Sequence, residues 1–387
     1  MRAERFFVGL IGVLALAGCE GGEAGPADTQ GAGVAGSGDR LVVVTTDFAT
    51  GAVAAIDLST GEGKADLALA STDAIPYVHE GRVYVVNRFM SDYVDVLDPA
   101  DGWSLVAQHA IEAVGTEVPS TNPQAVGFLD GGLALLTMYG APELHVYDFE
   151  RPVGEALIDV IDLSSLADGD GSTEATLVIP HGDEAWVAVQ RLDRRDGWAQ
   201  AAPDLLVRID AETLQLDDLD PERAGVQGVE LPGQWPKQFR VDPRNADRVY
   251  VLNGRLLAFD MKSRSVEVVV SPEQMAEAGI DFYQLPQSFD VSDDGETLVF
   301  AAYQSDFAAV HIYRVPATGG VPERIHAGFN SVEKTLEVEG EVIWFGDVTL
   351  GQAGVRRLSM DGELLDDGPI STGLPPYSVA VLPAATP

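Results

Sequence analysis

From residue 40 onward, short apolar runs alternate with short polar loops. One set of runs is β-branched, aromatic and almost continuously apolar, as a strand covered on both faces must be. This set comprises LVVVTT (41–46), RVYVVN (82–87), LALLTM (133–138), AWVAVQ (185–190), RVYVLN (248–253), LVFAAY (298–303) and VIWFGD (342–347). The pattern therefore predicts strands joined by tight turns.

A second apolar run follows each of these strands, and it usually ends in aspartate. The set comprises AVAAID (52–57), YVDVLD (93–98), ELHVYD (143–148), LLVRID (205–210) and RLLAFD (255–260), while 309–314 and 354–359 fit with the acid replaced. An aspartate at this point can accept hydrogen bonds from the backbone of the turn that it opens. We therefore expect these aspartates to be structural.

The unit of paired strands recurs seven times, which indicates a repeat array. In a β-propeller, each blade packs on its neighbours, so its inner strands are covered on both sides. The sequence therefore predicts an all-β fold, a seven-bladed β-propeller over residues 40–387. We name the strands of a blade a to d from the centre outward, so that the first set above supplies strand b and the second supplies strand c.

Both ends of the repeat array point to closure of the ring. The first unit begins directly with strand b at 41–46. The last segment, LPPYSVAVLP at 374–383, reads as a strand of type a that no further strand follows. If the tail supplies the missing strand of blade 1, no sheet edge is left open. We expect ring closure by the C-terminal strand.

The repeats also resemble a known family. PKQFRVDPRNADRVYVLN (236–253) and PQSFDVSDDGETLVFAA (286–302) resemble the YVTN-type β-propeller repeat, which implies seven blades. The copies are degenerate, and blade 4 departs most through the insertion QRLDRRDGWAQAAPD (190–204). One helix is expected near 271–279, where Ser271 and Gln274 form a capping-box pattern with proline at the first helical position.

The amino terminus has the pattern of an export signal. Arg2 and Arg5 precede an apolar run over 6–17 that is too short to span a membrane. The sequence LAGC that ends at Cys19 resembles the bacterial lipobox, which implies removal of residues 1–18 and lipidation of Cys19 with palmitate-type chains. Residues 19–39 then read as a flexible Gly/Ala-rich linker. An ordinary secretory leader with an incidental cysteine is the alternative.

The lipobox resemblance also predicts where the protein is located. A lipidated Cys19 would attach it to a membrane of the bacterial cell envelope. Glu20 does not resemble the aspartate that retains some lipoproteins at the inner membrane, which favours the outer membrane. Periplasmic and surface-facing orientations both stay open.

Charge and motif content exclude several classes of function. The chain has 24 Lys+Arg against 61 Asp+Glu, a net charge of −37, which argues against nucleic acid as a partner. The motifs HExxH, CxxCH and GxSxG are absent, so no catalytic residue and no cofactor is predicted. Gly31, Gly33 and Gly36 match a dinucleotide fingerprint formally, but they lie in the linker without a preceding strand.

The b–c and d–a loops of a propeller crowd one end of its channel, where binding sites usually lie. The candidate ligand-face residues are Arg88, Asp92, Tyr139, Arg191, Arg194, Arg195, Trp198, Asn253, Tyr303 and Asp347. Rigid aromatic rings beside arginines suit a recognition surface. The three arginines of the insertion either receive an anionic group or neutralise neighbouring aspartates, and the sequence leaves both interpretations open.

An acidic loop offers a candidate metal site. Asp168, Asp170 and Glu174 provide alternating oxygen donors of the kind that calcium prefers. The full EF-hand spacing is absent, and a polar connector between blades is the alternative. Calcium is therefore the metal that we expect this loop to suit.

These observations predict a non-enzymatic, envelope-anchored propeller that recognises a protein, peptide or glycan partner through its loop face. The alternatives are a lactonase-like hydrolase on the same architecture and a calcium-dependent adhesin. Convergence of Arg88, Arg191 and Asp347 on one pocket would favour a small-ligand site or an enzyme. Their separation over a broad rim would favour a partner.

Overall fold

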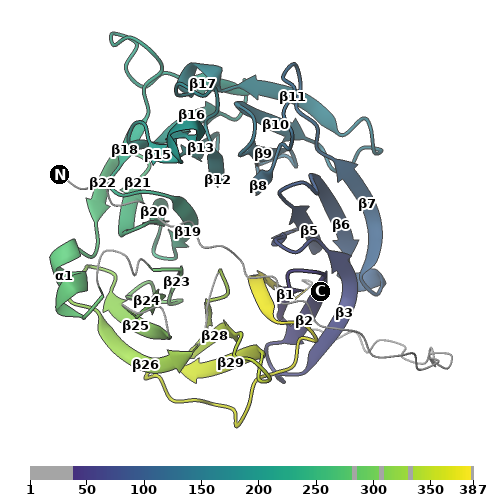
Figure 1. Cartoon of the computed structure of the whole chain (residues 1–387), viewed down its shortest axis with the longest axis vertical. Coiled ribbons are helices and arrows are strands. Elements are labelled where there is room, and N and C mark those ends of the chain that lie inside the picture. Colours follow the sequence, from purple (N-terminus) through teal and green to yellow (C-terminus); the bar gives the residue numbers. More distant parts are fainter. Residues whose placement is uncertain (1–37, 281–285, 305–308, 330–333, 385–387) are drawn as a thin grey trace. The chain divides into compact units, whose positions relative to one another are not determined.

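The chain from Gly36 to Pro387 forms one compact unit of seven small antiparallel sheets arranged in a ring (Figure 1). The computed structural model describes residues 38–280, 286–304, 309–329 and 334–384. Cys19, the leader over 1–18 and most of the linker lie outside the described residues. Within the described ranges, no helix is long and apolar enough to cross a membrane.

Each sheet is one blade, and its strands follow one another outward from the centre. Blade 1 contains β30 (Pro376–Leu382), β1 (Arg40–Thr46), β2 (Gly51–Asp57) and β3 (Gly63–Ala70). Blade 2 contains β4 (Ile75–His79), β5 (Arg82–Asn87), β6 (Tyr93–Asp98) and β7 (Ser104–Ala110). Blade 3 contains β8 (Pro123–Phe128), β9 (Ala134–Met138), β10 (Glu143–Tyr147) and β11 (Leu157–Asp162).

Blades 4 to 6 keep this order with local additions. Blade 4 contains β12 (Ala175–His181), β13 (Glu184–Val189), β16 (Asp204–Asp210), β17 (Gln215–Asp217) and β18 (Val229–Leu231), which pairs with β16. Blade 5 contains β19 (Pro236–Asp242), β20 (Asn245–Asn253), β21 (Leu256–Asp260) and β22 (Ser265–Val268). Blade 6 contains β23 (Ser288–Val291), β24 (Thr297–Tyr303), β25 (Val310–Pro316) and β26 (Glu323–Phe329).

Blade 7 differs from the others. It contains β27 (Glu337–Glu339), β28 (Val342–Asp347) and β29 (Gly354–Ser359). Two isolated bridges, Val355 to Ile370 and Leu358 to Leu364, stand where other blades carry an outer strand. The seven-bladed prediction is confirmed, with this outer edge reduced.

The predicted ring closure is also confirmed. Strand β30 pairs with β1 from Leu382 opposite Arg40 to Pro376 opposite Thr45, so the two ends of the repeat array share one sheet. The hydroxyl of Ser378 donates to the carbonyl of Ala74 in the next blade at 2.8 Å. The C-terminal strand is thus fixed to blade 1 and to blade 2.

The core is divided among the contacts between neighbouring blades. In β1, Val42 and Val44 pack toward blade 2, whereas Leu41 and Val43 pack toward Trp344 of blade 7. Successive side chains of a strand point to opposite faces, so a strand between two blades needs apolar residues at every position. This explains the continuous apolar b strands of the sequence.

Shorter elements occur in the turns. The helix α1 (Pro272–Glu277) is present with the predicted capping box, in which the Ser271 side chain accepts from the Gln274 backbone. In the part of the chain that the structure describes, the 3-10 helices are η1 (Pro99–Asp101), η2 (Ser164–Leu166) and η3 (Arg194–Asp196). The blade 4 insertion forms the small hairpin of β14 (Leu192–Asp193) and β15 (Ala199–Gln200), with η3 at its tip.

Candidate binding face

We call loop face the end of the ring that is formed by the b–c and d–a loops. Among the described residues, the b–c loops comprise 47–50, 88–92, 139–142, 190–203, 254–255, 304, 309 and 348–353. The described parts of the d–a loops are 71–74, 111–122, 163–174, 232–235, 269–280, 286–287, 334–336 and 360–375. The opposite end, formed by the a–b and c–d turns, is the turn face.

Asp92 fixes one loop of this face onto another. Its carboxylate accepts hydrogen bonds from the Ser120 hydroxyl at 2.8 Å and from the Asn122 backbone at 3.0 Å. The Phe89 backbone in turn donates to the Asn122 side chain at 3.0 Å. Asp92 itself has a φ of 53°, a conformation that costs energy outside glycine and persists where contacts enforce it. The Asp92 carboxylate therefore holds loop 88–92 against loop 111–122.

Arg88 joins three blades. Its Nε donates to the Asp73 carbonyl at 2.6 Å, and its two terminal nitrogens donate to Gln124 Oε1 and to the Tyr377 hydroxyl, each at 2.9 Å. Tyr377 belongs to β30 of blade 1, and Gln124 belongs to β8 of blade 3. The side chain is only 12% exposed. Arg88 thus links the inner strands around the ring closure.

Arg194 is the centre of the insertion. Its guanidinium donates to the Glu174 carboxylate, with Nη2 2.9 Å from Oε1, and to the Tyr139 carbonyl at 2.6 Å. Glu174 is fully buried, and it also accepts from the Leu192 backbone at 3.0 Å. Burial raises the pKa of Glu174. The arginine therefore compensates a carboxylate that would otherwise be buried without a counter-charge.

The other two arginines of the insertion also have partners. Arg195 Nε lies 3.4 Å from the Asp193 carboxylate. Arg191 donates through Nε to the Pro203 carbonyl at 2.9 Å, and burial lowers its pKa. Arg194 and Arg195 thus neutralise neighbouring acids. Arg191 instead joins the two ends of its own loop through its hydrogen bond to Pro203.

The candidate calcium ligands lie beside this arginine. Asp170 accepts hydrogen bonds from the Arg194 backbone at 2.7 Å and from the Ser172 backbone at 2.9 Å. Asp168 accepts from the Asp170 backbone at 2.9 Å. Among the residues that the structure describes, no group of three or more His, Cys, Asp or Glu side chains could hold a metal ion. Calcium binding at this loop stays a prediction.

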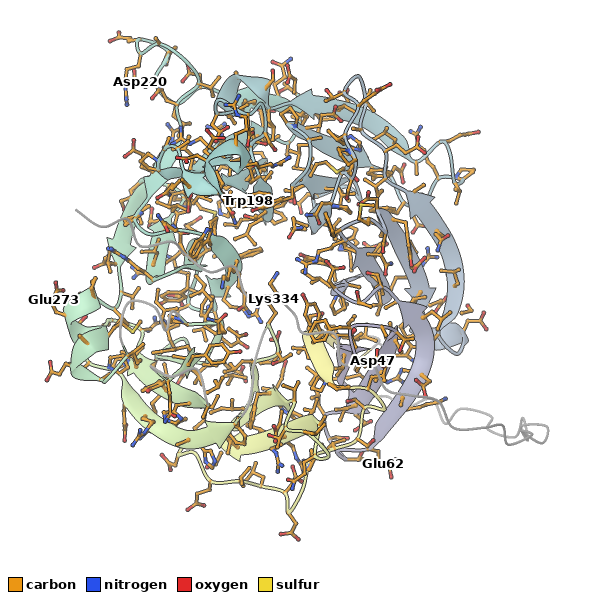
Figure 2. The ribbon with its side chains drawn as sticks, viewed as in Figure 1. Asp47, Glu62, Trp198, Asp220, Glu273 and Lys334 are labelled. Atoms are coloured by element: carbon orange, nitrogen blue, oxygen red, sulfur yellow. The ribbon has the colours of Figure 1, made fainter. Side chains whose placement is uncertain are left out.

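The aromatic rings of Tyr139 and Trp198 lie close together at the insertion. Tyr139 and Trp198 have ring centroids 6.1 Å apart, and Arg194 Cζ lies 5.5 Å from the Trp198 ring. Figure 2 shows Trp198 toward the inner end of blade 4. Trp198 as a whole remains 49% exposed. Trp198 therefore contacts Tyr139 and Arg194 and still has exposed surface available to a partner.

Three predicted candidates lie at strand ends. Asn253 is fully buried and donates to the Pro232 carbonyl at 3.3 Å. Asp347 is buried and accepts from Arg356 Nε at 2.6 Å, while Tyr303 is half-buried at the end of β24. Asn253 and Asp347 are thus buried at the ends of their strands, and a role for them in ligand binding stays a prediction.

Asp204 is a buried acid that the sequence analysis did not single out. It is fully buried at the start of β16, and it accepts from Gln200 Nε2 and from the Trp235 backbone, each at 3.0 Å. Burial raises the pKa of Asp204 to about 7. Its two donors come from the insertion and from loop 232–235, so this carboxyl couples the two loops.

Exposed apolar side chains are the feature of this face that the sequence analysis missed. Phe48, Phe89, Met90 and Leu350 are 78%, 63%, 66% and 96% exposed in the b–c loops of blades 1, 2 and 7. Blades 7, 1 and 2 are consecutive around the ring. The signal was present in the sequence as large apolar residues inside polar hairpin loops, such as Phe89-Met90 after Arg88.

Comparisons with known proteins show the fold. Neither a protein-family model nor a curated protein matches the chain. A periplasmic gluconolactonase of Pseudomonas aeruginosa has a similar structure, with a TM-score of 0.60 and 15% identity over 90% of this chain and 99% of that one. A protein from Lactobacillus plantarum gives a TM-score of 0.58 and 13% identity over 89% and 99% of the two chains. A functionally unknown protein from Desulfotomaculum acetoxidans gives 0.55 and 13% over the same shares.

Proposed function

We propose that this chain is a lipoprotein of the bacterial cell envelope whose propeller binds a protein, peptide or glycan partner through the loop face. The observation that carries the proposal is the exposure of Phe48, Phe89, Met90 and Leu350 on consecutive blades. Large apolar side chains beside polar loops are the usual anchors of a recognition surface.

The loops that present these anchors are held in place by internal contacts. Phe48 and Met90 have φ values of 64° and 66°, and the backbone of each donates to a side-chain oxygen at 2.9 and 3.0 Å, respectively. A surface that is ordered before binding loses less conformational entropy when a partner arrives. Rigid apolar anchors therefore favour binding as the role of this face.

The proposed anchor is compatible with a free loop face. Strand β1 begins at Arg40 on the turn face, where the Leu58 backbone donates to the Asp39 carbonyl at 3.0 Å. A linker from a lipidated Cys19 would thus join the propeller at the end opposite to the loop face. We place the protein at the outer membrane, on the basis of Glu20 after the cysteine.

A lactonase-like hydrolase is the alternative, because a periplasmic gluconolactonase shares this architecture. The polar candidates favour binding over catalysis. Arg88 contacts Gln124 and Tyr377, whereas Arg191 contacts Pro203 on blade 4. Arg88 and Arg191 thus lie on different blades, and this separation favours a broad binding rim over a single catalytic pocket. Ring opening of gluconolactone by the purified chain, lost in a loop-face variant, would establish the alternative instead.

The binding proposal is tested by cross-linked capture of the full-length lipoprotein from its own membranes. The variant Phe89→Ser/Met90→Ser removes two exposed anchors, and the matched control Leu69→Ser/Leu105→Ser removes two exposed residues from the outer strands β3 and β7. We expect the yield of a specific partner to fall at least about tenfold in the loop-face variant alone. Equal yields from both variants would contradict the proposal.

A further inference from the structure

Two exposed tryptophans lie on the loop face at blades 4 and 5. Trp198 lies between η3 and β15 of the insertion, and Trp235 lies directly before β19. They are 49% and 41% exposed, whereas the other tryptophans of the chain, Trp103, Trp186 and Trp344, are at most 7% exposed. Tryptophan is among the residues that most often anchor a binding surface, so we examined what surrounds this pair.

A pair of amide side chains joins the two loops that carry these tryptophans. Gln234 Nε2 donates to Gln200 Oε1 at 2.7 Å, and Gln200 Nε2 donates in turn to the Asp204 carboxylate at 3.0 Å. The other oxygen of Asp204 accepts from the Trp235 backbone at 3.0 Å. Gln234 immediately precedes Trp235 in the chain. Gln200 lies two residues after Trp198, so the amide pair connects the backbones that carry both indoles.

The backbone around both tryptophans is fixed by contacts. The Gln234 backbone donates to the Asn253 carbonyl at 3.1 Å, and the Asn253 side chain donates to the Pro232 carbonyl at 3.3 Å. Trp198 and Trp235 both have a φ of 67°, a left-handed conformation that residues other than glycine keep only where their surroundings enforce it. A ligand therefore meets indoles whose backbone is already ordered, which lowers the entropy cost of binding.

Polar groups beside the indoles retain hydrogen-bonding capacity. Among the described residues, none donates to Gln234 Oε1, and Gln200 Nε2 has a second N–H beyond the one that it gives to Asp204. Arg191 bonds the Pro203 carbonyl through Nε and Nη2, so its Nη1 remains for another acceptor. The side chains of Gln200, Gln234 and Arg191 are all partly exposed. The surface thus offers an acceptor and two donors beside two aromatic rings.

We infer that this surface, formed by Trp198, Trp235, Gln200, Gln234 and Arg191, binds an uncharged saccharide chain. The C–H groups of a pyranose ring carry partial positive charge and pack on the negative face of an indole. Its hydroxyl groups donate and accept hydrogen bonds, as the two amides do. The net charge of −37 disfavours acidic saccharides. The inference rests on the proposed function, because it names the ligand class that one part of the loop face recognises.

The inference is tested with an array of neutral, N-acetylated and uronic-acid oligosaccharides, probed with the full-length chain. We expect binding to uncharged glycans, reduced at least about tenfold in Trp198→Ser/Trp235→Ser. The matched control Phe89→Ser/Met90→Ser also removes two exposed apolar side chains, and it should bind these glycans normally. No binding to uncharged glycans, or equal losses in both variants, would overturn the inference. Partner capture uses only the control variant, so the two proposals fail independently.

Tryptophan fluorescence of the unmodified chain locates the bound glycan without any substitution. Acrylamide quenches exposed indoles, which here are those of Trp198 and Trp235. A saturating concentration of an array-positive glycan should lower the quenching constant at least about twofold, because a stacked sugar ring covers the indole face. Unchanged quenching at saturation would place the glycan elsewhere and overturn the inference.

A matched pair of glutamine variants tests the hydrogen-bonding part of the site. Gln234→Leu removes the available acceptor, and it should weaken glycan binding at least about fivefold. Gln215 is exposed on the outer strand β17, so Gln215→Leu should leave the affinity unchanged. Equal affinities of the two variants would contradict the inference.

A proline-rich peptide is the other ligand class that exposed aromatic rings suit. A polyproline peptide is therefore titrated in parallel with the array-positive glycans. Binding of the peptide without binding of any glycan would overturn the inference.

Discussion

At the residue scale, the clearest agreement between sequence and structure concerns the aspartates that end the c strands. Asp57, Asp98, Asp148, Asp210 and Asp260 each accept hydrogen bonds from the backbone of the following turn. In Asp210, the contact with the Thr213 backbone is the main cause of a lowered pKa. A short-range rule was sufficient here, because the donor and the acceptor lie within three residues of each other.

The pH dependence of stability should reveal the buried carboxyl of Asp204. Its pKa rises from an ordinary 3.8 to about 7 in the folded chain, so the folded state retains a proton that the unfolded state releases. The free energy of unfolding therefore falls as the pH rises from about 4 to about 7 and then levels off. This loss amounts to at most about 1.4 kcal/mol per pH unit. We expect the variant Asp204→Asn to lack it.

Urea unfolding between about pH 5 and about pH 8 measures this effect. The difference in unfolding free energy between Asp204→Asn and the unmodified chain should shift in favour of the variant as the pH rises. The exposed Asp130 supplies the control, and Asp130→Asn should show a constant difference. A constant difference for Asp204→Asn would exclude a raised pKa at this position.

The two neighbouring arginines of the insertion should differ strongly in their contribution to stability. Arg194→Ala leaves the buried Glu174 without its counter-charge, which we expect to cost about 3 kcal/mol of unfolding free energy. Arg195 is 64% exposed, and an exposed ion pair contributes less than about 1 kcal/mol. Urea unfolding of the two variants measures the contrast. Similar losses would argue against a structural role for Arg194.

At the scale of elements, blade 1 depends on the last strand of the chain. Strand β30 supplies its innermost strand, and Val379 packs in the same cluster as Leu41 and Trp344. Without β30, the backbone of β1 would form an open inner edge, and the contacts with blades 7 and 2 would be lost. An unpaired edge strand also promotes aggregation.

Truncation tests this closure. A chain that ends at Leu374 lacks β30, and its Tm should fall by on the order of 10 °C, or the protein should become insoluble. A chain that ends at Ala384 keeps β30 and is the matched control. Thermal unfolding followed by circular dichroism measures both. A Tm shared by the two truncated chains would show that the tail does not close the ring.

At the scale of the whole molecule, the ring separates two faces with different chemistry. The loop face carries the exposed side chains of Phe48, Phe89, Met90 and Leu350. The turn face carries a cavity between blades 2 and 3 that acidic and aromatic residues line. Figure 2 shows Asp220, Glu273 and Glu62 around the periphery, where charged side chains are solvated.

By itself, the sequence determined the features that depend on neighbours along the chain. Strand period, turn-opening aspartates, the capping box of α1 and the number of blades all follow from local spacing. The missing first strand of blade 1 was also visible, because a repeat array with an unpaired strand at each end has one simple closure.

Only the tertiary structure decided which polar side chains are free. Arg88 is engaged by Gln124 and Tyr377, and Arg194 is engaged by Glu174, 20 residues away in the chain. The cavity at the turn face joins residues of two blades, such as Tyr84 and Phe149, whose distance no local pattern encodes. Exposure and pairing depend on the packing of one blade against the next, and therefore appear only once the ring has closed.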